Sequence, residues 1–278
     1  VIDALPDYNS PVEHGIICVK GRFGITEYVH SPLRYGTPKE MTPVGYNDIS
    51  WEEALSRAAG KLSGLKPEEC LFVISPQLLN EDLFAAQQFI RQVAGSEEIA
   101  SSFIFDLDGD AVAYMNLIFA SEPIDAIEKA QGIMAVGFDS RYGYSSIGVN
   151  VKKAVQAGAF LTNINAFETN LDIISDASFV MDTSKWADTL ESIIKGLSRG
   201  RTDRKPSESA GKWKKFIDRA CTELSRLKNN VLIVGTGVID AKNRERILKA
   251  IERLKNEFSW KVIVAHPYSN LNGMLAMG

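Results

Sequence analysis

Apolar positions along the chain alternate between a helical spacing and a strand-like one. After Ser50, which forms a capping box with Glu53, apolar residues recur along one face of a helix as far as Leu65. Beyond that helix, strand-length apolar runs alternate with helical patterns. Strands are predicted at residues 71–74, 103–105, 132–137, 160–164, 179–181, 231–234 and 262–265. Helices are predicted at residues 80–93, 112–119, 146–157, 186–197, 213–227 and around 247–258.

This alternation predicts an α/β fold of mostly parallel sheets with helices on both faces. Residues 1–48 differ, because they are rich in proline and glycine and show no sustained periodicity. We interpret them as a short, irregular β segment that leans on another surface. Residues 49–100 are predicted to form a first α/β subdomain. Residues 101–278 are predicted to form a second, dinucleotide-binding-like one with an exposed loop at 199–212.

The composition argues against several classes of protein. The 278 residues include 31 basic and 35 acidic side chains, for a net charge of −4, so no overall positive charge attracts a polyphosphate backbone. No apolar run approaches the ~20 residues of a membrane-spanning helix, and the first residues do not resemble a signal peptide. We therefore expect a cytoplasmic protein with no nucleic-acid partner and no direct insertion into a membrane.

Two glycine-bearing turns follow predicted buried strands. Gly235-Thr236-Gly237 comes after the strand at 231–234, and Gly137-Phe138-Asp139-Ser140 comes at the end of the strand at 132–137. Each turn is predicted to lead into a helix, whose positive end attracts anionic groups. Two such turns at the carboxyl edge of one sheet would outline a nucleotide cleft. The alternative is a structural turn without a ligand, because the third glycine of GxGxxG and the lysine of a phosphate loop are missing.

The histidines and two of the cysteines do not indicate a metal site. His14, His30 and His266 lack metal-ligand spacing, and no hydrolase motif accompanies them. Cys70 fits the edge of a strand, and Cys221 belongs to the apolar stripe of an amphipathic helix, where a thiol acts as a small core residue.

Cys18 lies in a different setting, the glycine-bearing segment GIICVKGRFG at residues 15–24. Lys20 places a cation near its thiolate, and the flanking glycines leave the backbone uncrowded, which suits an iron–sulfur ligand. A cubane cluster needs four cysteines, so a single loop cysteine also fits an inert thiol.

Six motifs carry a resemblance to a known family through their shared order. They are CVKGRFG at 18–24, VHSPLR at 29–34, SWEEAL at 50–55, LNED at 79–82, GTGV at 235–238, and SNLNG at 269–273 with MG at 277–278. In this order they resemble the molybdopterin oxidoreductases. That family includes formate dehydrogenases, nitrate reductases and the large iron–sulfur subunit of NADH-quinone oxidoreductase.

The resemblance implies an internal fragment of a redox subunit. Cys18 would be the fourth ligand of a [4Fe–4S] cluster whose other cysteines precede Val1, and residues 1–48 would be the remnant of that cluster domain. Lys20 would be the catalytic cation between the cluster and a pterin. Other subunits of a redox complex are the implied partners, and they would hold the protein at the periphery of the inner membrane. A molybdopterin guanine dinucleotide is implied at Gly137, Asp139, Ser140, Asn165, Gly235, Thr236, Gly237, Asn270 and Gly273.

Three departures from the family pattern bear on function. GFDS at 137–140 replaces a G-x-N-P turn, and NAF at 165–167 replaces D-P-R, so a carboxylate for the nucleotide and an arginine for phosphate are lost. No cysteine stands in residues 95–110, where molybdenum is often bound. The oxygen donors suited to molybdenum there are Ser101, Ser102 and Asp106.

These departures favour an electron-transferring subunit similar to the large iron–sulfur subunit of NADH dehydrogenase, with a degenerate pterin site. The alternative is an active formate dehydrogenase-type molybdenum enzyme that binds bis-molybdopterin guanine dinucleotide. A third possibility, from another class, is a non-catalytic α/β assembly module. The isolated chain is expected to be inactive, because its cluster and cofactor cage would be incomplete.

Overall fold

The computed structural model describes residues 3–10, 15–103, 108–199 and 211–277. The chain divides into two compact units. The first contains residues 1–6, 17–105 and 268–278, and the second contains residues 7–16 and 106–267. The sequence patterns predicted a boundary between residues 100 and 101, with residues 268–278 in the second subdomain. In the structure those last residues join the first unit.

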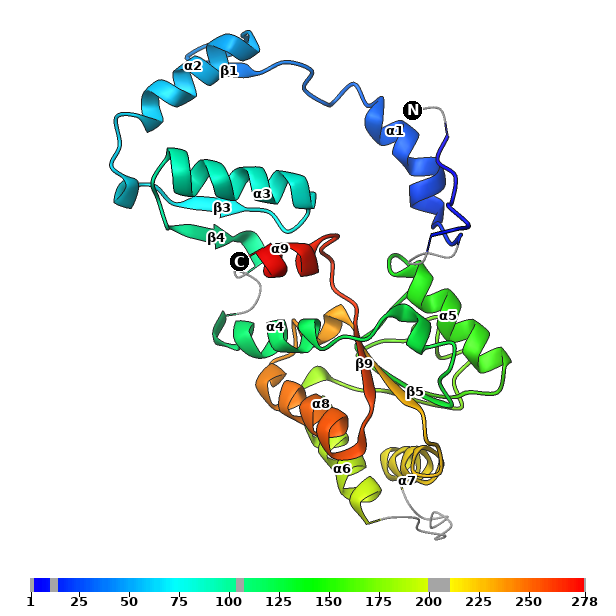
Figure 1. The fold of residues 1–278 in the computed structure, drawn as a ribbon. Coiled ribbons are helices and arrows are strands. Elements are labelled where there is room, and N and C mark those ends of the chain that lie inside the picture. Colours follow the sequence, from blue (N-terminus) through cyan, green and yellow to red (C-terminus); the bar gives the residue numbers. More distant parts are fainter. Residues whose placement is uncertain (1–2, 11–14, 104–107, 200–210, 278) are drawn as a thin grey trace. The chain divides into compact units, whose positions relative to one another are not determined.

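The second unit is built on a sheet whose described strands all run parallel (Figure 1). β5 (Gly132–Val136) lies at the centre, with Gly132 aligned with Phe160 on one side and with Asn230 on the other. Along their whole length β5 and β8 are buried, as expected of apolar strands covered on both faces. In the strand order β7-β6-β5-β8-β9, the neighbours of β5 are β6 (Phe160–Asn165) and β8 (Asn230–Val234), and the two edge strands are β7 (Ala177–Val180) and β9 (Lys261–Val264).

Helices flank this sheet. α5 (Ser145–Gln156) packs on one face, where Ile147 and Val151 join Ile133 of β5 in one hydrophobic cluster. Met134 and Val136 point to the opposite face and are also fully buried. Burying one such side chain contributes about 1.5–3 kcal/mol to folding. α6 contacts both α7 and α8, and α4 contacts α8 and β9. The bounds of these helices are α4 (Ala111–Phe119), α6 (Trp186–Ser198), α7 (Lys212–Leu224) and α8 (Arg244–Phe258).

Short helical turns occur between these elements. In the first unit, η2 (Pro67–Glu69) is a 3₁₀ turn. Those of the second unit are η5 (Asp108–Asp110), η6 (Ile124–Ala126), η7 (Thr183–Lys185) and η8 (Thr236–Val238). Among the described helices of both units, none is long and apolar enough to cross a membrane.

The first unit contains a small α/β layer. β3 (Phe72–Ile74) and β4 (Ile99–Ser101) pair in parallel, and α3 (Asn80–Gln88), continued by the π-helical turn η3 (Phe89–Val93), links them. Gly95, at φ = 65°, follows the end of η3. Leu83 and Ile90 of this helical segment are buried. α9 (Leu271–Met277) packs against α3.

Ahead of this layer lie a hairpin and a capped helix. β1 (Lys39–Thr42) and β2 (Gly45–Asp48) pair antiparallel. The predicted helix start is confirmed, because α2 (Trp51–Leu62) begins after Ser50, whose hydroxyl accepts the Glu53 N–H at 3.1 Å. This bond is one half of the predicted capping box, while the Glu53 carboxylate binds Arg57. α2 has no buried residue among those described, so its apolar face is exposed.

The structure differs from the sequence-based expectation within residues 1–48. The hairpin and the turns and coil at residues 3–10, 15–18 and 30–38 match the predicted irregular β segment. Residues 20–29 do not match it, because they are helical, as η1 (Lys20–Gly24) and α1 (Ile25–Val29). The prolines that suggested irregular backbone lie outside this stretch. Local backbone hydrogen bonds, such as Arg22 N–H to Cys18 O at 2.9 Å, therefore form without interruption.

Two further expectations fall partly outside the described residues. A strand was predicted at 103–105, of which residues 104 and 105 are not described, and Phe103 is not in a strand. The strand that pairs with β3 is β4 at 99–101, where Ile99 is aligned with Phe72. Phe103 is instead buried against the Tyr268 ring, with centroids 5.3 Å apart. The predicted exposed loop at 199–212 falls mostly outside the described residues.

Candidate functional site

The carboxyl ends of β5 and β8 form the switch point of the parallel sheet. From β5 the chain continues to β6 on one side, and it later returns to β8 on the other. Ligands of open α/β sheets bind at such a point. The loops after these two strands, residues 137–144 and 235–243, contain most of the residues predicted to bind a cofactor, and the structure brings them together.

Glycine allows these two loops to pack closely. Gly137 has φ = 62°, and a side chain there would meet the Trp186 ring at 2.9 Å. A side chain at Gly235 would overlap the carbonyl of Gly137, and one at Gly237 would lie 3.0 Å from the same oxygen. The glycines are therefore required for loop-to-loop contact, whatever else they do.

The backbone amides of the second turn bond within the protein. Gly235 N–H donates to Val136 O at 2.9 Å, and Gly237 N–H donates to Gly137 O at 3.0 Å. Neither glycine turn opens directly into a long helix as the sequence suggested, since α8 begins at Arg244 and α5 at Ser145. The anion-attracting helix ends are thus separated from the glycines by several residues.

Asn165 holds the first loop in place. Its side chain is 3% exposed, its amide N–H donates to Phe138 O at 2.9 Å, and its Oδ1 accepts the Ala166 N–H at 2.8 Å. Asn165 thus connects the end of β6 to the loop after β5. Both polar groups of the Asn165 side chain are therefore hydrogen-bonded within the protein.

Asp139 and Arg141 form an ion pair in the same loop. Arg141 Nε lies 3.0 Å from Asp139 Oδ2 and its terminal nitrogen lies 2.8 Å from that oxygen, while the Arg141 backbone N–H donates to Oδ1 at 3.0 Å. Burial acts to raise the pKa of Asp139, but the hydrogen bonds and charge of Arg141 outweigh it and hold the pKa below its usual range. Both side chains are therefore charged at neutral pH.

Two more polar pairs close the edge of the loops. Ser140 Oγ and the Asn170 side chain lie within hydrogen-bond distance, with Asn170 Nδ2 donating at 2.8 Å. The Tyr144 hydroxyl of the β5 loop is close to the Thr236 side chain of the β8 loop, and burial raises its pKa by more than Thr236 lowers it. Tyr144 adopts φ = 55°, a left-handed conformation uncommon for a non-glycine residue.

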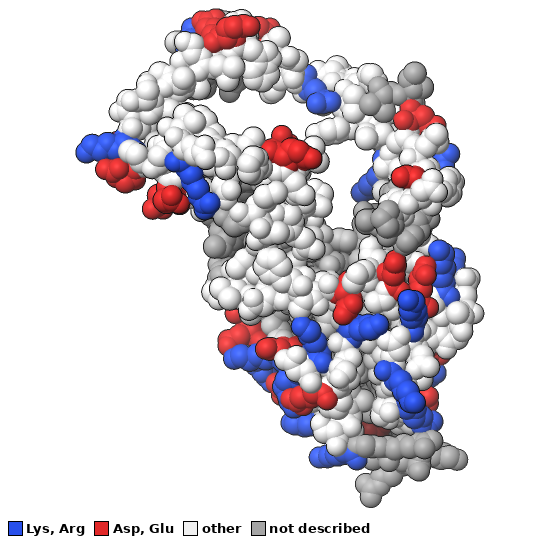
Figure 2. Space-filling model, in the orientation of Figure 1, with Lys and Arg blue, Asp and Glu red and all other residues white. Residues whose placement is uncertain are grey.

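Charges of both signs surround the switch point. Asp182, after β7, accepts the Ser184 N–H at 2.9 Å. The pKa of Asp182 is lowered, mainly by its hydrogen bonds to Ser184 and to a smaller extent by the charges of Lys242 and Lys185. Asn243 Nδ2 donates to Ser184 O at 2.8 Å and so ties the β8 loop to η7. Figure 2 shows blue and red side chains intermixed over the lower part of the molecule, with no large area of one sign on this face.

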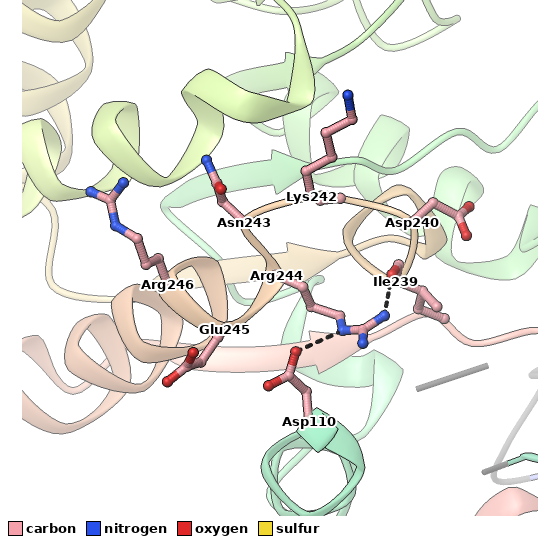
Figure 3. A pocket seen from close by; sticks show the side chains of 9 residues that line it. Asp110, Ile239, Asp240, Lys242, Asn243, Arg244, Glu245 and Arg246 are labelled. Atoms are coloured by element: carbon pink, nitrogen blue, oxygen red, sulfur yellow. Dashed lines mark hydrogen bonds and ion pairs between the residues drawn. The ribbon is translucent and has the colours of Figure 1, made fainter. Parts of the chain in front are cut away.

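A pocket of about 610 Å³ lies next to the β8 loop and the start of α8. Figure 3 shows the Arg244 fork held between Asp110 and the backbone of Ile239, at 3.1 Å and 2.6 Å. Lys242 and Arg246 extend away from Arg244. Arg246 is instead bound to Asp188 and Glu191, each at 2.8 Å. Both arginines at this pocket therefore already have carboxylate partners.

The predicted cluster ligand lies in the first unit. Cys18 is exposed, and its Sγ accepts the Gly21 N–H at 3.3 Å. Lys20, predicted as the catalytic cation, begins η1 two residues later and is also exposed. Within the described part of the chain, no group of three or more His, Cys, Asp and Glu residues could hold a metal ion. Cys18 could therefore be only one ligand of a cluster that needs others.

Asn270 and Gly273, the remaining predicted cofactor residues, also lie in the first unit. Asn270 Nδ2 donates to Leu78 O at 2.7 Å and to Asn80 Oδ1 at 2.9 Å. A side chain at Gly273 would overlap the oxygens of both asparagine side chains. Two motifs far apart in the sequence, LNED and SNLNG, therefore meet in one structural contact.

Comparison with known proteins identifies the family. A family profile described as molybdopterin oxidoreductase matches residues 44–273. The chain belongs to the molybdopterin oxidoreductase family. A molybdopterin enzyme is also similar in structure: acetylene hydratase from Pelobacter acetylenicus superposes with a TM-score of 0.54 over 94% of this chain and 37% of that one. At 15% identity this likeness shows the fold alone.

Curated molybdopterin relatives match part of the chain. The alpha subunit of F420-dependent formate dehydrogenase 2 of Methanococcus maripaludis is 33% identical over 99 residues, which are 36% of this chain and 14% of that protein. The alpha subunit of formate dehydrogenase 1 of the same organism is 35% identical over 94 residues, 34% of this chain and 14% of that protein. A putative formate dehydrogenase of Staphylococcus aureus is 26% identical over 103 residues, which are 36% of this chain and 10% of that protein. The matched part is thus a small fraction of these relatives.

Membership of the molybdopterin family implies a molybdenum–pterin cofactor, and the switch point can be tested for its dinucleotide. A diphosphate needs outward N–H groups and an available cation. Here Gly235 and Gly237 donate inward, Asn165 is bonded at both ends, and Arg141 is bound to Asp139. These four residues therefore do not offer a diphosphate the groups that it needs. Binding of a pterin guanine dinucleotide by the predicted residues stays a prediction.

The sequence analysis did not identify three residues that shape the sheet edge at the switch point. They are Arg141, Tyr144 and Trp186. Arg141 stands two residues after Asp139, so the pair could have been noticed, but only the loop conformation turns the side chains toward each other. Trp186 was assigned to a helix start, which is correct, and its fully buried ring packs beneath the glycines.

Proposed function

We propose that the longer protein containing this chain is an electron-transferring subunit of molybdopterin oxidoreductase type, similar to the large iron–sulfur subunit of NADH dehydrogenase. In this proposal Cys18 is one ligand of a [4Fe–4S] cluster. The observation that carries it is the exposed Cys18 Sγ with the Gly21 N–H directed at it, since backbone hydrogen bonds to cysteine sulfur are a feature by which proteins tune such clusters. The other ligands would come from polypeptide outside the 278 residues.

Lys20 would act on this cluster electrostatically. It lies two residues from Cys18 and at the start of the same helical segment. A nearby positive charge favours the reduced, more negative cluster over the oxidised one. Loss of the Lys20 charge should therefore lower the reduction potential of the cluster without removing iron.

The switch-point geometry supports a degenerate pterin site in this proposal. Its polar groups bond to each other, so they would stabilise the sheet edge in place of a cofactor. Other subunits of a redox complex would then supply and remove electrons, and they would locate the protein at the inner membrane periphery from the cytoplasmic side.

The test uses the full-length protein with Cys18→Ala and, as a matched control, Cys70→Ala. Cys70 is a partly buried thiol next to β3 and has no role in the proposal. Iron and acid-labile sulfide content are measured together with the electron paramagnetic resonance spectrum after reduction. Cys18→Ala should lose the signal of one cluster, while Cys70→Ala should keep it. An unchanged spectrum in Cys18→Ala contradicts the proposal.

A second candidate is favoured by the names of the relatives, which are formate dehydrogenase subunits. In that case the longer protein would be a formate-oxidising molybdenum enzyme. Elemental analysis of the full-length protein and formate-dependent reduction of its cluster separate the two. Molybdenum together with formate-driven reduction would support the enzyme, and absence of both would support the electron-transfer subunit.

A further inference from the structure

The loop after β5 lies in the second unit and does not involve Cys18. Asp139 and Arg141 follow Gly137 at the switch point, where an α/β sheet ordinarily presents its ligand-binding groups. The pair is partly exposed, with 19% of the Asp139 side chain and 39% of the Arg141 side chain accessible. A solute can therefore reach Arg141.

The Asp139 carboxylate occupies Arg141 in the way an anionic ligand would. Two guanidinium N–H groups and the backbone N–H of Arg141 all donate to the same carboxylate. A guanidinium fork matches carboxylate and phosphate oxygens equally well. The carboxylate is thus a built-in competitor of any phosphate that approaches the fork.

Aromatic rings surround the guanidinium. Arg141 lies 5.8 Å from the ring centroid of Tyr142, next to it in the chain, and 5.8 Å from that of Phe167, in the loop after β6. Both rings are exposed, Tyr142 by 78% and Phe167 by 52%. The negative charge of Asp172 also acts on Arg141. The guanidinium therefore lies over two exposed aromatic rings, and exposed rings of this kind can stack with a flat base.

We propose that Asp139 is an internal anion that blocks the phosphate-binding capacity of Arg141, so that this edge excludes nucleoside diphosphates until the carboxylate is removed. The exclusion has two parts. Because Asp139 is two residues from Arg141, it competes at a high effective concentration, of the order of millimolar or above. Its negative charge also repels a phosphate at short distance.

The experiment measures binding of guanosine diphosphate and of inorganic pyrophosphate to the 278-residue chain by calorimetry at low salt. Wild type should show no saturable binding of either probe below roughly 1 mM. Asp139→Asn should bind guanosine diphosphate at least 10-fold more tightly than wild type, because Arg141 is then free for the phosphate. Asp139→Ser, which also removes the charge, provides a second variant if the first does not fold.

Two controls make the result specific. Asp188→Asn removes one carboxylate from another arginine ion pair, so it makes the same change in net charge away from the loop. It should bind no more tightly than wild type. Adding Arg141→Gln to Asp139→Asn should abolish the gain.

Three outcomes would overturn the proposal: wild type that already binds as tightly as Asp139→Asn, a gain no larger than that of Asp188→Asn, or a gain that survives Arg141→Gln. None of them depends on iron or on Cys18, so the proposal can fail while the electron-transfer function stands, and the reverse.

Discussion

The carbonyl oxygen of Gly137 accepts a hydrogen bond from the Gly237 N–H at 3.0 Å. A Cβ atom at residue 237 would lie only 3.0 Å from the same oxygen. The β5 loop and the β8 loop are therefore in backbone contact at the switch point. This contact gives the sheet edge its shape and is the reason why glycine is required in both turns.

Gly235→Ala should destabilise the second unit by about 1–3 kcal/mol, because the added methyl overlaps the backbone of Gly137 and Phe138. Thermal unfolding followed by circular dichroism gives the change. Gly143→Ala is the matched control, since a Cβ there meets nothing within 4 Å. A change at Gly235 no larger than at Gly143 would show that the loops are less closely packed than described.

Asp110→Ala should also destabilise the second unit, by about 1–3 kcal/mol, because it leaves the mostly buried Arg244 guanidinium without its carboxylate partner at 3.1 Å. Glu257→Gln, in the exposed pair with Arg253, should cause no measurable change. Equal unfolding midpoints for both variants would mean that the Asp110–Arg244 pair adds nothing to stability.

The thiols should differ in reactivity. Burial raises the pKa of Cys221 to about 12, so at pH 8 only about one molecule in ten thousand carries its thiolate. Cys18 is exposed. Iodoacetamide at pH 8 should label Cys18 while Cys221 stays unmodified until the protein is unfolded, as read by peptide mass spectrometry. Rapid labelling of Cys221 in the folded chain would contradict its burial.

Stability should decrease on mild acidification because of His266. Burial lowers the pKa of this imidazole below 6.5 in the folded state. The unfolded chain then binds more protons than the folded one, so stability is complete above the unfolded pKa of about 6.5 and is lost as the pH falls toward the folded value. Unfolding midpoints between pH 7.5 and 5.5 should vary less in His266→Gln than in wild type.

The control for this titration is His30→Gln, at an exposed position of the first unit. It removes one histidine but leaves His266 in place, so the change attributed to His266 should remain. A His266→Gln profile that parallels wild type would assign the acid sensitivity to other groups.

The fold of the second unit could be predicted well from sequence. β5 and β8 are continuous apolar runs bounded by polar or glycine residues, and that pattern is typical of strands covered on both faces. The helix at 20–29 was missed because composition alone suggested irregular backbone. The position of β4 was not predicted correctly. A strand of three residues has too few alternating positions to locate it from sequence, and its position is decided by pairing with β3.

The site was harder to predict than the fold. The glycine turns and Asn165 were found by their position after strands, but their hydrogen bonds run into the protein and not toward a cleft. Such directions depend on loop conformation, which sequence spacing does not specify. The same holds for Asp139, which was predicted to face a nucleotide and instead faces Arg141.

The contact between Asn80 and Asn270 has a consequence for synthesis of the protein. The two residues are 190 positions apart, and both belong to the first unit. At 5–20 residues per second, a ribosome needs about 10–40 s to produce the second partner after the first. During that interval α3 is without α9, so the first unit stays incomplete until residues 106–267 of the second unit have been synthesised.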